Sequence, residues 1–351
     1  MKPSIRDNTG YDSPSPIRWE KAGVRASLAF VSLLSIALVQ FFLPLRALAW
    51  GHEGHEVIAA LAQTMLSNNV LAKVQSILQT NEMASVALWA DQARQLMKYH
   101  TGPLTNSDEA KHFIAAHPDN ADWHFLNLPL KTSGYDYNGR FATNTDIVHA
   151  LTNCIAVLEG QPGSITTTQA LRYIIHLAGD IHQPLHVACG YYVPKGNSAK
   201  LLKRPGAISN TEAHDAGANK LIWLTGQTTN NLHAYWDDHM VTTVDPSTGN
   251  SQMMIILQSA IAKNANLWKG RNDYHNWPAR WAEDSAGEAN GVYKGVTFQS
   301  AVFKANDVPK EITITLPNNY DAQQNQRVTR QLAKAGYHLA ELLNQIRWAQ
   351  P

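Results

Sequence analysis

Apolar residues recur three and four positions apart along most of the chain, a spacing that predicts amphipathic helices. The spacing runs through residues 55–66, 83–97, 146–158, 168–181, 216–225, 253–268 and 327–346. The alternation typical of a half-buried strand is rare, and its best example is residues 311–316, closed by Pro317. The pattern therefore predicts an all-α fold, one compact helical domain with long loops and little or no strand.

Two stretches show neither spacing and are expected to be loops. Residues 190–213 combine Gly, Pro and Ser with four basic side chains, and the second stretch is residues 284–322. The first stretch either overhangs a functional site or is a solvated insertion.

Residues 1–49 have the pattern of a secretory signal. A basic lead precedes the almost purely apolar run 26–45, and Ala47, Leu48 and Ala49 form a small-x-small cleavage site. An apolar run of about 20 residues can also span a bilayer, so an uncleaved membrane anchor is the alternative. Cleavage after Ala49 would leave a domain of residues 50–351 that is secreted or periplasmic.

The charge and the cysteine content of the chain exclude several classes of protein. Residues 50–351 carry 23 basic and 25 acidic side chains, so a general basic surface for nucleic acid is not expected and any polyanion must bind at a local site. The two cysteines exclude a disulfide-stapled miniprotein and a four-cysteine zinc module. Export permits a disulfide between Cys154 and Cys189, and two free buried thiols are the alternative.

Histidine occurs 15 times, and it gathers with carboxylates in short clusters. In the densest cluster His176 and Asp180 lie four residues apart, which places both on one face of a helix. Pro184 then disrupts the helix and can redirect His186. Imidazole and carboxylate at such spacing suit zinc. We interpret His182, which lies well off that face, as a residue that packs in the core or supports the metal ligands from behind.

Three further clusters repeat this chemistry. His233 and Asp237 also lie four residues apart. Asp91 lies within an apolar stretch, where an unpaired carboxylate is costly, and a salt bridge to Arg94 is the simplest alternative to a metal. His124 lies in an extended apolar segment, where a lone histidine is more often part of the core.

A fifth cluster lies at the expected cleavage point. Processing would leave Trp50 with a free α-amine, which binds a metal once deprotonated, while the carbonyl of the same residue completes a chelate. His52 and His55 are three residues apart rather than four, so they do not form the zinc-protease pattern.

These five clusters, in this order, resemble the S1/P1 nuclease family, in its bacterial-type secreted form, which belongs with the zinc-dependent phospholipases C. The resemblance covers essentially all of residues 50–351. Asp215-Ala-Gly-Ala-Asn219 resembles the family's Asp-x-Gly-Gly-Asn loop, with Ala218 in place of the second Gly. Residues 281–285 resemble its Trp-Ala-x-Glu-Ser segment, and residues 335–344 resemble its last helix.

The resemblance implies three zinc ions per chain, held by nine residues. The implied ligands are Asp91, His124 and His176 for the first zinc, Trp50 and His55 for the second, Asp180 as a bridge between these two, and His186, His233 and Asp237 for the third. Three divalent cations outweigh the three aspartates, so the pocket would be locally cationic and would attract a phosphodiester.

The implied activity is that of an endonuclease and 3′-nucleotidase that hydrolyses single-stranded DNA and RNA to 5′-phosphate products, with a hydroxide shared by the two bridged zinc ions as nucleophile. Its partners would be single-stranded nucleic acid and 3′-nucleotides, bound by a monomer without stable membrane association. The implied catalytic residues are Asp91, Arg94, Asp180 and Asn127, and the implied substrate-binding residues are Phe125 and Asn219. Phe125 would stack on an unpaired base. Asn127 stands where many members of the family have Asp.

Two other functions remain open at this point. The first is a phospholipase C on the same metal scaffold, although its last ligand is typically Glu rather than Asp237. The second is a non-catalytic zinc-binding or anchored helical protein, which is favoured if the signal stays uncleaved and Trp50 has no free amine.

Overall fold

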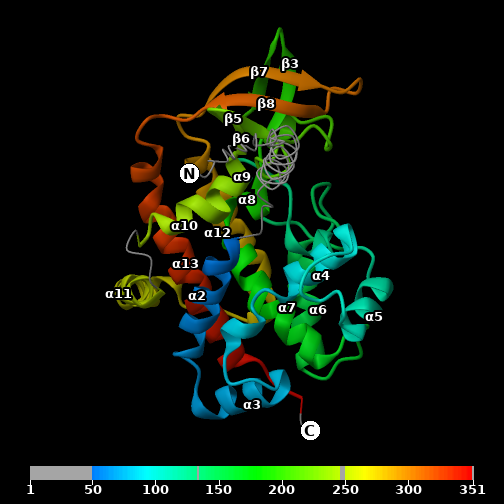
Figure 1. Cartoon of the computed structure of the whole chain (residues 1–351), viewed down its shortest axis with the longest axis vertical. Coiled ribbons are helices and arrows are strands. Elements are labelled where there is room, and N and C mark those ends of the chain that lie inside the picture. The colour runs from blue at the N-terminus through cyan, green and yellow to red at the C-terminus, as the bar shows by residue number, and fades with distance from the viewer. Residues whose placement is uncertain (1–49, 133, 246–249, 350–351) are drawn as a thin grey trace, which may run out of the picture. The chain divides into compact units, whose positions relative to one another are not determined.

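The structure, a computed structural model, describes residues 50–132, 134–245 and 250–349 (Figure 1). The expected signal peptide, residues 1–49, lies outside these residues. No helix within the described ranges combines the length and the apolar character needed to cross a membrane.

Helices make up 54% of the structure and strands 13%, so the fold is mostly helical but not strictly all-α. The longer helices are α2 (Gly51–Gln63), α3 (Asn68–Leu78), α4 (Trp89–Tyr99), α5 (Asp108–Ala116), α6 (Ile147–Leu158), α7 (Thr167–Asp180), α11 (Asn250–Trp268), α12 (Trp277–Val292) and α13 (Tyr320–Gln345). Six of the seven segments with helical spacing fall on these helices. Residues 83–97 divide into a short 3-10 turn, η1 (Met83–Val86), and α4.

Helix α7 lies at the centre of the core. Its N-terminus is closed by a capping box between Thr166 and Gln169, and every residue of its last two turns is buried. Helices α2, α4, α6 and α13 pack around it. Gly336 on α13 permits a close approach to α2, because a Cβ at this position would lie 2.7 Å from Leu61.

The strands form three small sheets, gathered mainly at the upper end of Figure 1. Their bounds are β1 (Leu128–Pro129), β2 (Ala188–Cys189), β3 (Tyr191–Lys195), β4 (Ser198–Leu202), β5 (Leu221–Thr225), β6 (Thr228–Asn231), β7 (Thr297–Phe303) and β8 (Pro309–Thr315). Strands β1 and β2 pair in parallel, β3 and β4 form an antiparallel hairpin, and the largest sheet has the order β6-β5-β8-β7.

Three expectations about local structure were wrong, and one was right. Residues 216–225 end in strand β5 rather than forming a helix, because its four consecutive apolar residues fit either element. The expected loop 190–213 contains the β3–β4 hairpin, and the expected loop 284–322 contains the end of α12, two strands and the start of α13. The predicted strand 311–316 is confirmed as most of β8.

The two cysteines are free and buried, so the expected disulfide is not formed. Cys154 lies on α6 within the main core, whereas Cys189 lies on β2 in a separate small cluster with Tyr191 and Ile208. The alternative of two buried thiols is therefore correct.

Candidate metal centre

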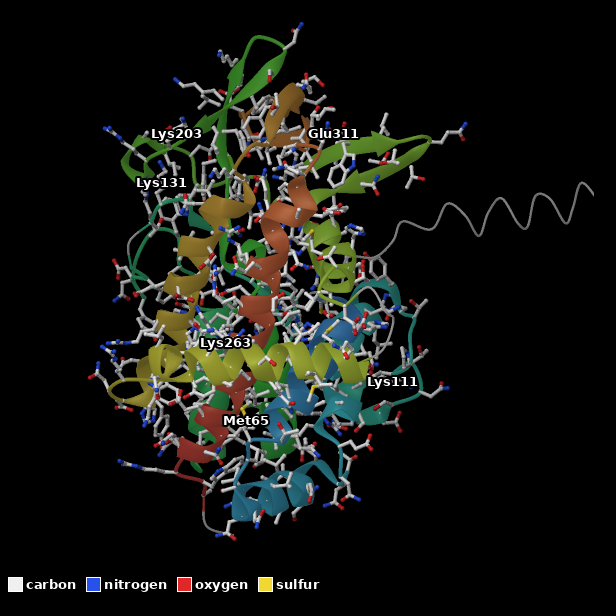
Figure 2. All side chains as sticks on the ribbon, turned by 90° about the vertical axis from the view of Figure 1, so that its left-hand side faces the viewer. Met65, Lys111, Lys131, Lys203, Lys263 and Glu311 are labelled. Atoms are coloured by element: carbon white, nitrogen blue, oxygen red, sulfur yellow. The ribbon has the colours of Figure 1, made fainter. Side chains whose placement is uncertain are left out.

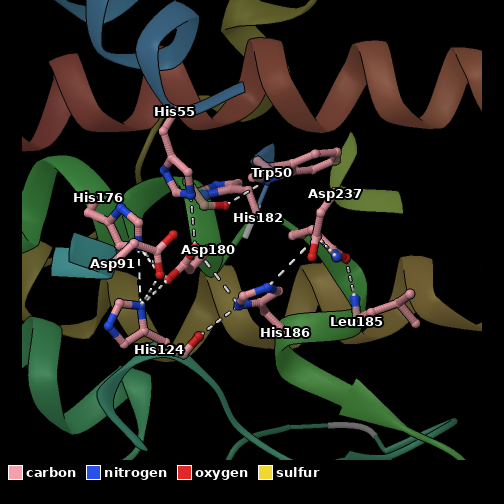
Figure 3. A network of polar contacts seen from close by, with 12 residues as sticks. Trp50, His55, Asp91, His124, His176, Asp180, His182, Leu185, His186 and Asp237 are labelled. Atoms are coloured by element: carbon pink, nitrogen blue, oxygen red, sulfur yellow. Dashed lines mark hydrogen bonds and ion pairs between the residues drawn. The ribbon is translucent and has the colours of Figure 1, made fainter. Parts of the chain in front are cut away.

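The structure brings eight of the predicted ligand side chains into three buried groups, and Figure 3 labels all of them except His233. The ligand atoms within each group all lie within 4.8 Å of one another. The groups are His55, His176 and Asp180; Asp91, His124 and His176; and His186, His233 and Asp237. The first two groups share His176, and Asp180 contacts members of both.

Helix α7 supplies the centre of this arrangement. His176 and Asp180 lie one helical turn apart, with His176 Nε2 3.2 Å from Asp180 Oδ2. The other oxygen of Asp180 lies 3.2 Å from His55 Nε2 on α2. Asp180 therefore faces two groups at once, as a bridging carboxylate would.

The third group depends on two interruptions of regular helix. Pro184 begins the short helix α8 (Pro184–Val187), which brings His186 toward the site. His233 lies on α9 (Leu232–Ala234), and Asp237 lies on the π-helical turn η4 (Tyr235–His239) that follows. His233 Nε2 is 3.3 Å from Asp237 Oδ2. Turns of this kind are frequent at functional sites.

Backbone carbonyls orient three of the imidazoles. A carbonyl only accepts, so each Nδ1 must carry the hydrogen, and in the neutral imidazole each Nε2 is then a lone-pair donor that faces the site. These bonds join His176 to Ala87 at 2.8 Å, His186 to His124 at 2.8 Å and His233 to Gly217 at 2.7 Å.

The site also contains buried polar atoms that have no hydrogen-bond partner among the described residues. They are both ring nitrogens of His55, both oxygens of Asp91, His124 Nε2, Asp180 Oδ1, His186 Nε2 and Asp237 Oδ2. Folded proteins seldom bury such atoms unpaired, because the lost hydration is not replaced. Imidazole nitrogens and carboxylate oxygens form the donor set that zinc prefers, so these residues fit a cluster of divalent cations.

Burial and neighbouring charges set the protonation of the group. Burial raises the pKa of Asp237 well above its ordinary value. Burial also opposes ionisation of Asp180, but the adjacent His176 and His186 hold the pKa of its carboxyl well below the usual range. Burial lowers the pKa of His176, yet the nearby carboxylates outweigh it and raise that pKa to about 9. The carboxylates therefore require positive charge beside them.

Trp50 is fully buried beside these groups. Its indole Nε1 donates to the carbonyl of Gly179 at 2.8 Å, and its own carbonyl accepts from the amide of Gly54 at 3.0 Å. A side chain at Gly179 would have its Cβ 2.8 Å from His55 Nδ1, so only glycine fits here. Chelation by the Trp50 amine requires processing after Ala49 and stays a prediction.

Four residues outside the ligand set are predicted to act in catalysis or substrate binding, and they differ in how far they are buried. Arg94 Nη1 is 3.5 Å from Asp91 Oδ1, and its side chain is 29% exposed, so the guanidinium extends from the site toward solvent. Phe125 and Asn127 are half-buried beyond His124, and the Asn127 carbonyl accepts from a tyrosine hydroxyl. Asn219 is exposed, and its side-chain amide donates to its own turn.

Sequence reasoning missed Gln183. Its Nε2 donates to Asp237 Oδ1 at 2.7 Å, and its Oε1 accepts from the amide of Leu185 at 2.6 Å. Gln183 therefore caps α8 and fixes one oxygen of Asp237, which leaves the other free toward His233. A polar residue directly before Pro184 was the only sequence signal for this role.

Sequence reasoning also missed the role of Asp215. This buried carboxylate accepts from the amide of Ala218 at 2.9 Å and from the hydroxyls of Tyr192 and Tyr293 at 3.0 and 2.9 Å. The turn that it holds has three consecutive residues with positive φ, at 56°, 59° and 65°. The middle residue, Gly217, supplies the carbonyl that orients His233.

Comparison with known proteins agrees with this site. The family model described as S1/P1 Nuclease matches residues 50–347. Endonuclease 2 of Arabidopsis thaliana is 26% identical over 85% of this chain and 90% of its own length, and nuclease P1 of Penicillium citrinum is 26% identical over 85% and 97%. Nuclease S1 of Aspergillus oryzae is 29% identical over 60% of this chain and 59% of its own. The three buried groups lie within the matched range, and the chain belongs to the S1/P1 nuclease family.

Proposed function

We propose that this protein is a zinc-dependent endonuclease and 3′-nucleotidase that hydrolyses single-stranded DNA and RNA to 5′-phosphate products. The observation that carries the proposal is the trio of buried His/Asp groups, several of whose ligand atoms have no hydrogen-bond partner within the described structure. Membership of the family and the names of the relatives, which are nucleases and endonucleases, support nucleic acid as the substrate.

Nine residues would hold three zinc ions. Asp91, His124 and His176 would bind the first, Trp50 and His55 the second, Asp180 both of these, and His186, His233 and Asp237 the third. Zinc in such a site lowers the pKa of bound water to about 7 and so supplies a nucleophile near neutral pH.

Arg94 would bind the substrate phosphate. Its guanidinium is held by Asp91 at the inner end and is partly open to solvent at the outer end. Two parallel N–H donors match the geometry of phosphate oxygens, and their charge would offset the negative charge that builds up at phosphorus. Asn127, two residues beyond Phe125, would hydrogen-bond nearby without adding charge.

Phe125 would select unpaired bases. It directly follows the ligand His124 and is half-buried, which leaves part of the ring open. An aromatic face stacks on any base but requires that base to be unstacked from its neighbours, which favours single strands. Asn219, exposed at the end of the turn held by Asp215, would contact a base edge.

We further propose that the processed enzyme is secreted or periplasmic and acts as a monomer. The basis is the secretory pattern of residues 1–49, together with the requirement that cleavage release the amine of Trp50.

Hydrolysis of single-stranded DNA by the exported, processed protein tests the proposal. Assays with a chelator, and then with zinc added back, should show activity lost and restored, and the products should carry 5′-phosphate ends. A protein that holds three zinc ions but cleaves neither DNA, RNA nor 3′-nucleotides would contradict the proposal. Hydrolysis of phosphatidylcholine by the same sample would instead favour the phospholipase alternative.

A further inference from the structure

A hollow of about 650 Å³ is lined by strand β4 and the residues just after it, and by the segment that leads into β7 together with the start of that strand. Its lining includes Lys200 on β4, Lys203 and Arg204 just after β4, and Tyr293, Val296 and Phe298. None of the lining residues is acidic. The hollow therefore has a cationic rim and an apolar floor.

The three cations of the rim are exposed and form no ion pair with any residue in the described ranges. Like charges that line one hollow repel one another, and an anionic partner bound there would lower that repulsion. Figure 2 shows Lys203 near the end of the molecule that carries the strands, far from Lys263 on α11.

The segments that line the hollow differ in net charge from the rest of residues 50–351. Residues 190–231 and 293–316 contain 8 basic and 4 acidic side chains, whereas the remainder of 50–351 contains 15 basic and 21 acidic ones. The two stretches that supply all of the hollow's lining residues are thus basic on balance, whereas the rest of 50–351 is acidic. Such a separation attracts a polyanion to one side of a protein.

The floor adds an apolar surface. Phe298 is half-buried and packs edge-on against Tyr192, with ring centroids 5.4 Å apart at 78°. Exposed parts of aromatic and aliphatic side chains contact bases or sugars without reading sequence, while cations contact phosphates. This combination fits a single-stranded polynucleotide better than a small anion or a duplex.

The hollow is also joined to the metal groups. Tyr293, which lines it, donates its hydroxyl to Asp215 at 2.9 Å, and the turn held by Asp215 presents the Gly217 carbonyl to His233 at 2.7 Å. Along the chain, only a few residues separate the ligand His186 from the start of β3.

We propose that this hollow binds the part of a single-stranded DNA or RNA that extends beyond the bond being cut. The proposal rests on the proposed nuclease function and assigns that function an extended substrate surface. Lys200, Lys203 and Arg204 bind phosphates, and the floor of Phe298 and Val296 supports the bases or sugars.

The triple variant Lys200→Ala, Lys203→Ala and Arg204→Ala tests the proposal. Fluorescence anisotropy of the zinc-loaded enzyme measures binding of a labelled 30-nucleotide phosphorothioate DNA, which resists cleavage, over a series of salt concentrations. The affinity should fall at least about tenfold at low salt, and the slope of log K against log salt should become shallower by about 2, because three phosphate contacts are lost. Turnover of a 3′-nucleotide, which has no chain beyond the bond being cut, should stay unchanged.

The matched control removes three positive charges elsewhere, with Lys111→Ala, Lys263→Ala and Lys269→Ala. It should leave the affinity within about twofold, and thermal melting should show that both variants are folded. Equal binding by the rim variant and the wild type, or an equal loss in the control, would overturn the proposal. If the wild-type enzyme cleaves no nucleic acid but rim-dependent binding persists, the nuclease function fails while the binding surface stands.

Discussion

The Gly217 carbonyl orients His233 from within a turn whose neighbouring residues, Ala216 and Ala218, both have positive φ. An L-residue in this left-handed region costs roughly 1–2 kcal/mol because its Cβ crowds the following carbonyl. Asp215 holds the turn in place from inside. At the scale of single residues, the orientation of His233, a proposed ligand, therefore depends on local backbone strain that the buried carboxylate of Asp215 maintains.

Replacement of Ala218 by glycine should relieve part of this strain. We expect Ala218→Gly to raise the free energy of unfolding by about 0.5 kcal/mol, because glycine adopts positive φ freely but gains entropy in the unfolded chain. Urea denaturation measures the change. Ala72→Gly, at an exposed position within α3, is the matched control and should lower stability by about 1 kcal/mol. A loss of similar size in both variants would show that the turn is not strained.

Phe125→Ala separates substrate binding from metal binding. We expect the KM for single-stranded DNA to rise by about 5- to 150-fold, which corresponds to 1–3 kcal/mol of lost stacking, while zinc content is unchanged. Kinetics and metal analysis of the same preparation measure both quantities. The control Tyr337→Ala removes a half-buried aromatic ring from α13 and should leave the KM unchanged. An unaltered KM in Phe125→Ala would show that Phe125 serves in core packing and does not stack on a base.

At the scale of secondary structure, helical spacing is the most reliable signal in the sequence. Helices long enough to show it, such as α6 and α7, are predicted within one or two residues of their ends. The same spacing correctly predicts that His176 and Asp180 share one face of α7. Neither Gln183 nor Asp215 could be assigned this way, because their roles arise only from contacts between distant segments.

The β3–β4 hairpin was missed although a signal for it existed. Gly196 and Asn197 lie between the two strands, a pair typical of two-residue hairpin turns, and Gly196 has the required positive φ of 57°. The strands β3 and β4 carry several polar and basic residues, so the alternation of apolar and polar positions that predicts a strand is weak there. Strand β5 was also predicted wrongly, although it pairs with the adjacent β6 in a hairpin around Gly226 and Gln227, because its run of four apolar residues fits either a helix or a strand.

The position of Asp180 on α7 leads to a prediction about the zinc content of a variant. Asp180 contacts both His55 and His176, so Asp180→Ala should remove two of the three zinc ions together and abolish activity. Native mass spectrometry of the processed protein counts the ions directly. Asp273→Ala, which removes a carboxylate paired with His275 at an exposed position, should keep all three. Three ions retained in Asp180→Ala would rule out the bridging role.

At the scale of the whole molecule, the metal ions should contribute to global stability. The proposed ligands come from segments spread over residues 50–237, and without cations the site would keep several buried polar atoms without hydrogen-bond partners. A site occupied at about a thousand times its dissociation constant stabilises the fold by about 4 kcal/mol, which corresponds to roughly 10 °C in Tm for a chain of this size.

Differential scanning calorimetry with and without a chelator measures this effect. We expect the chelated protein to melt about 10 °C or more below the zinc-loaded protein, and zinc added back before heating should restore the higher Tm. Calcium or magnesium added instead should not, because these ions prefer all-oxygen sites. Equal melting temperatures with and without chelator would show that the groups are held together by protein contacts alone.

The close packing of α2 against α13, made possible by Gly336, has a consequence for the order of folding. Synthesis produces α2, which carries His55, more than 250 residues before α13. Helix α2 also packs against η1, α7 and α11, but its packing is completed only when α13 has been made, and contacts of such long sequence separation form slowly. A chain still attached to the ribosome, or one truncated before α13, would lack the support that α13 gives to α2 and its His55, so the metal centre should reach its final geometry late in the protein's maturation.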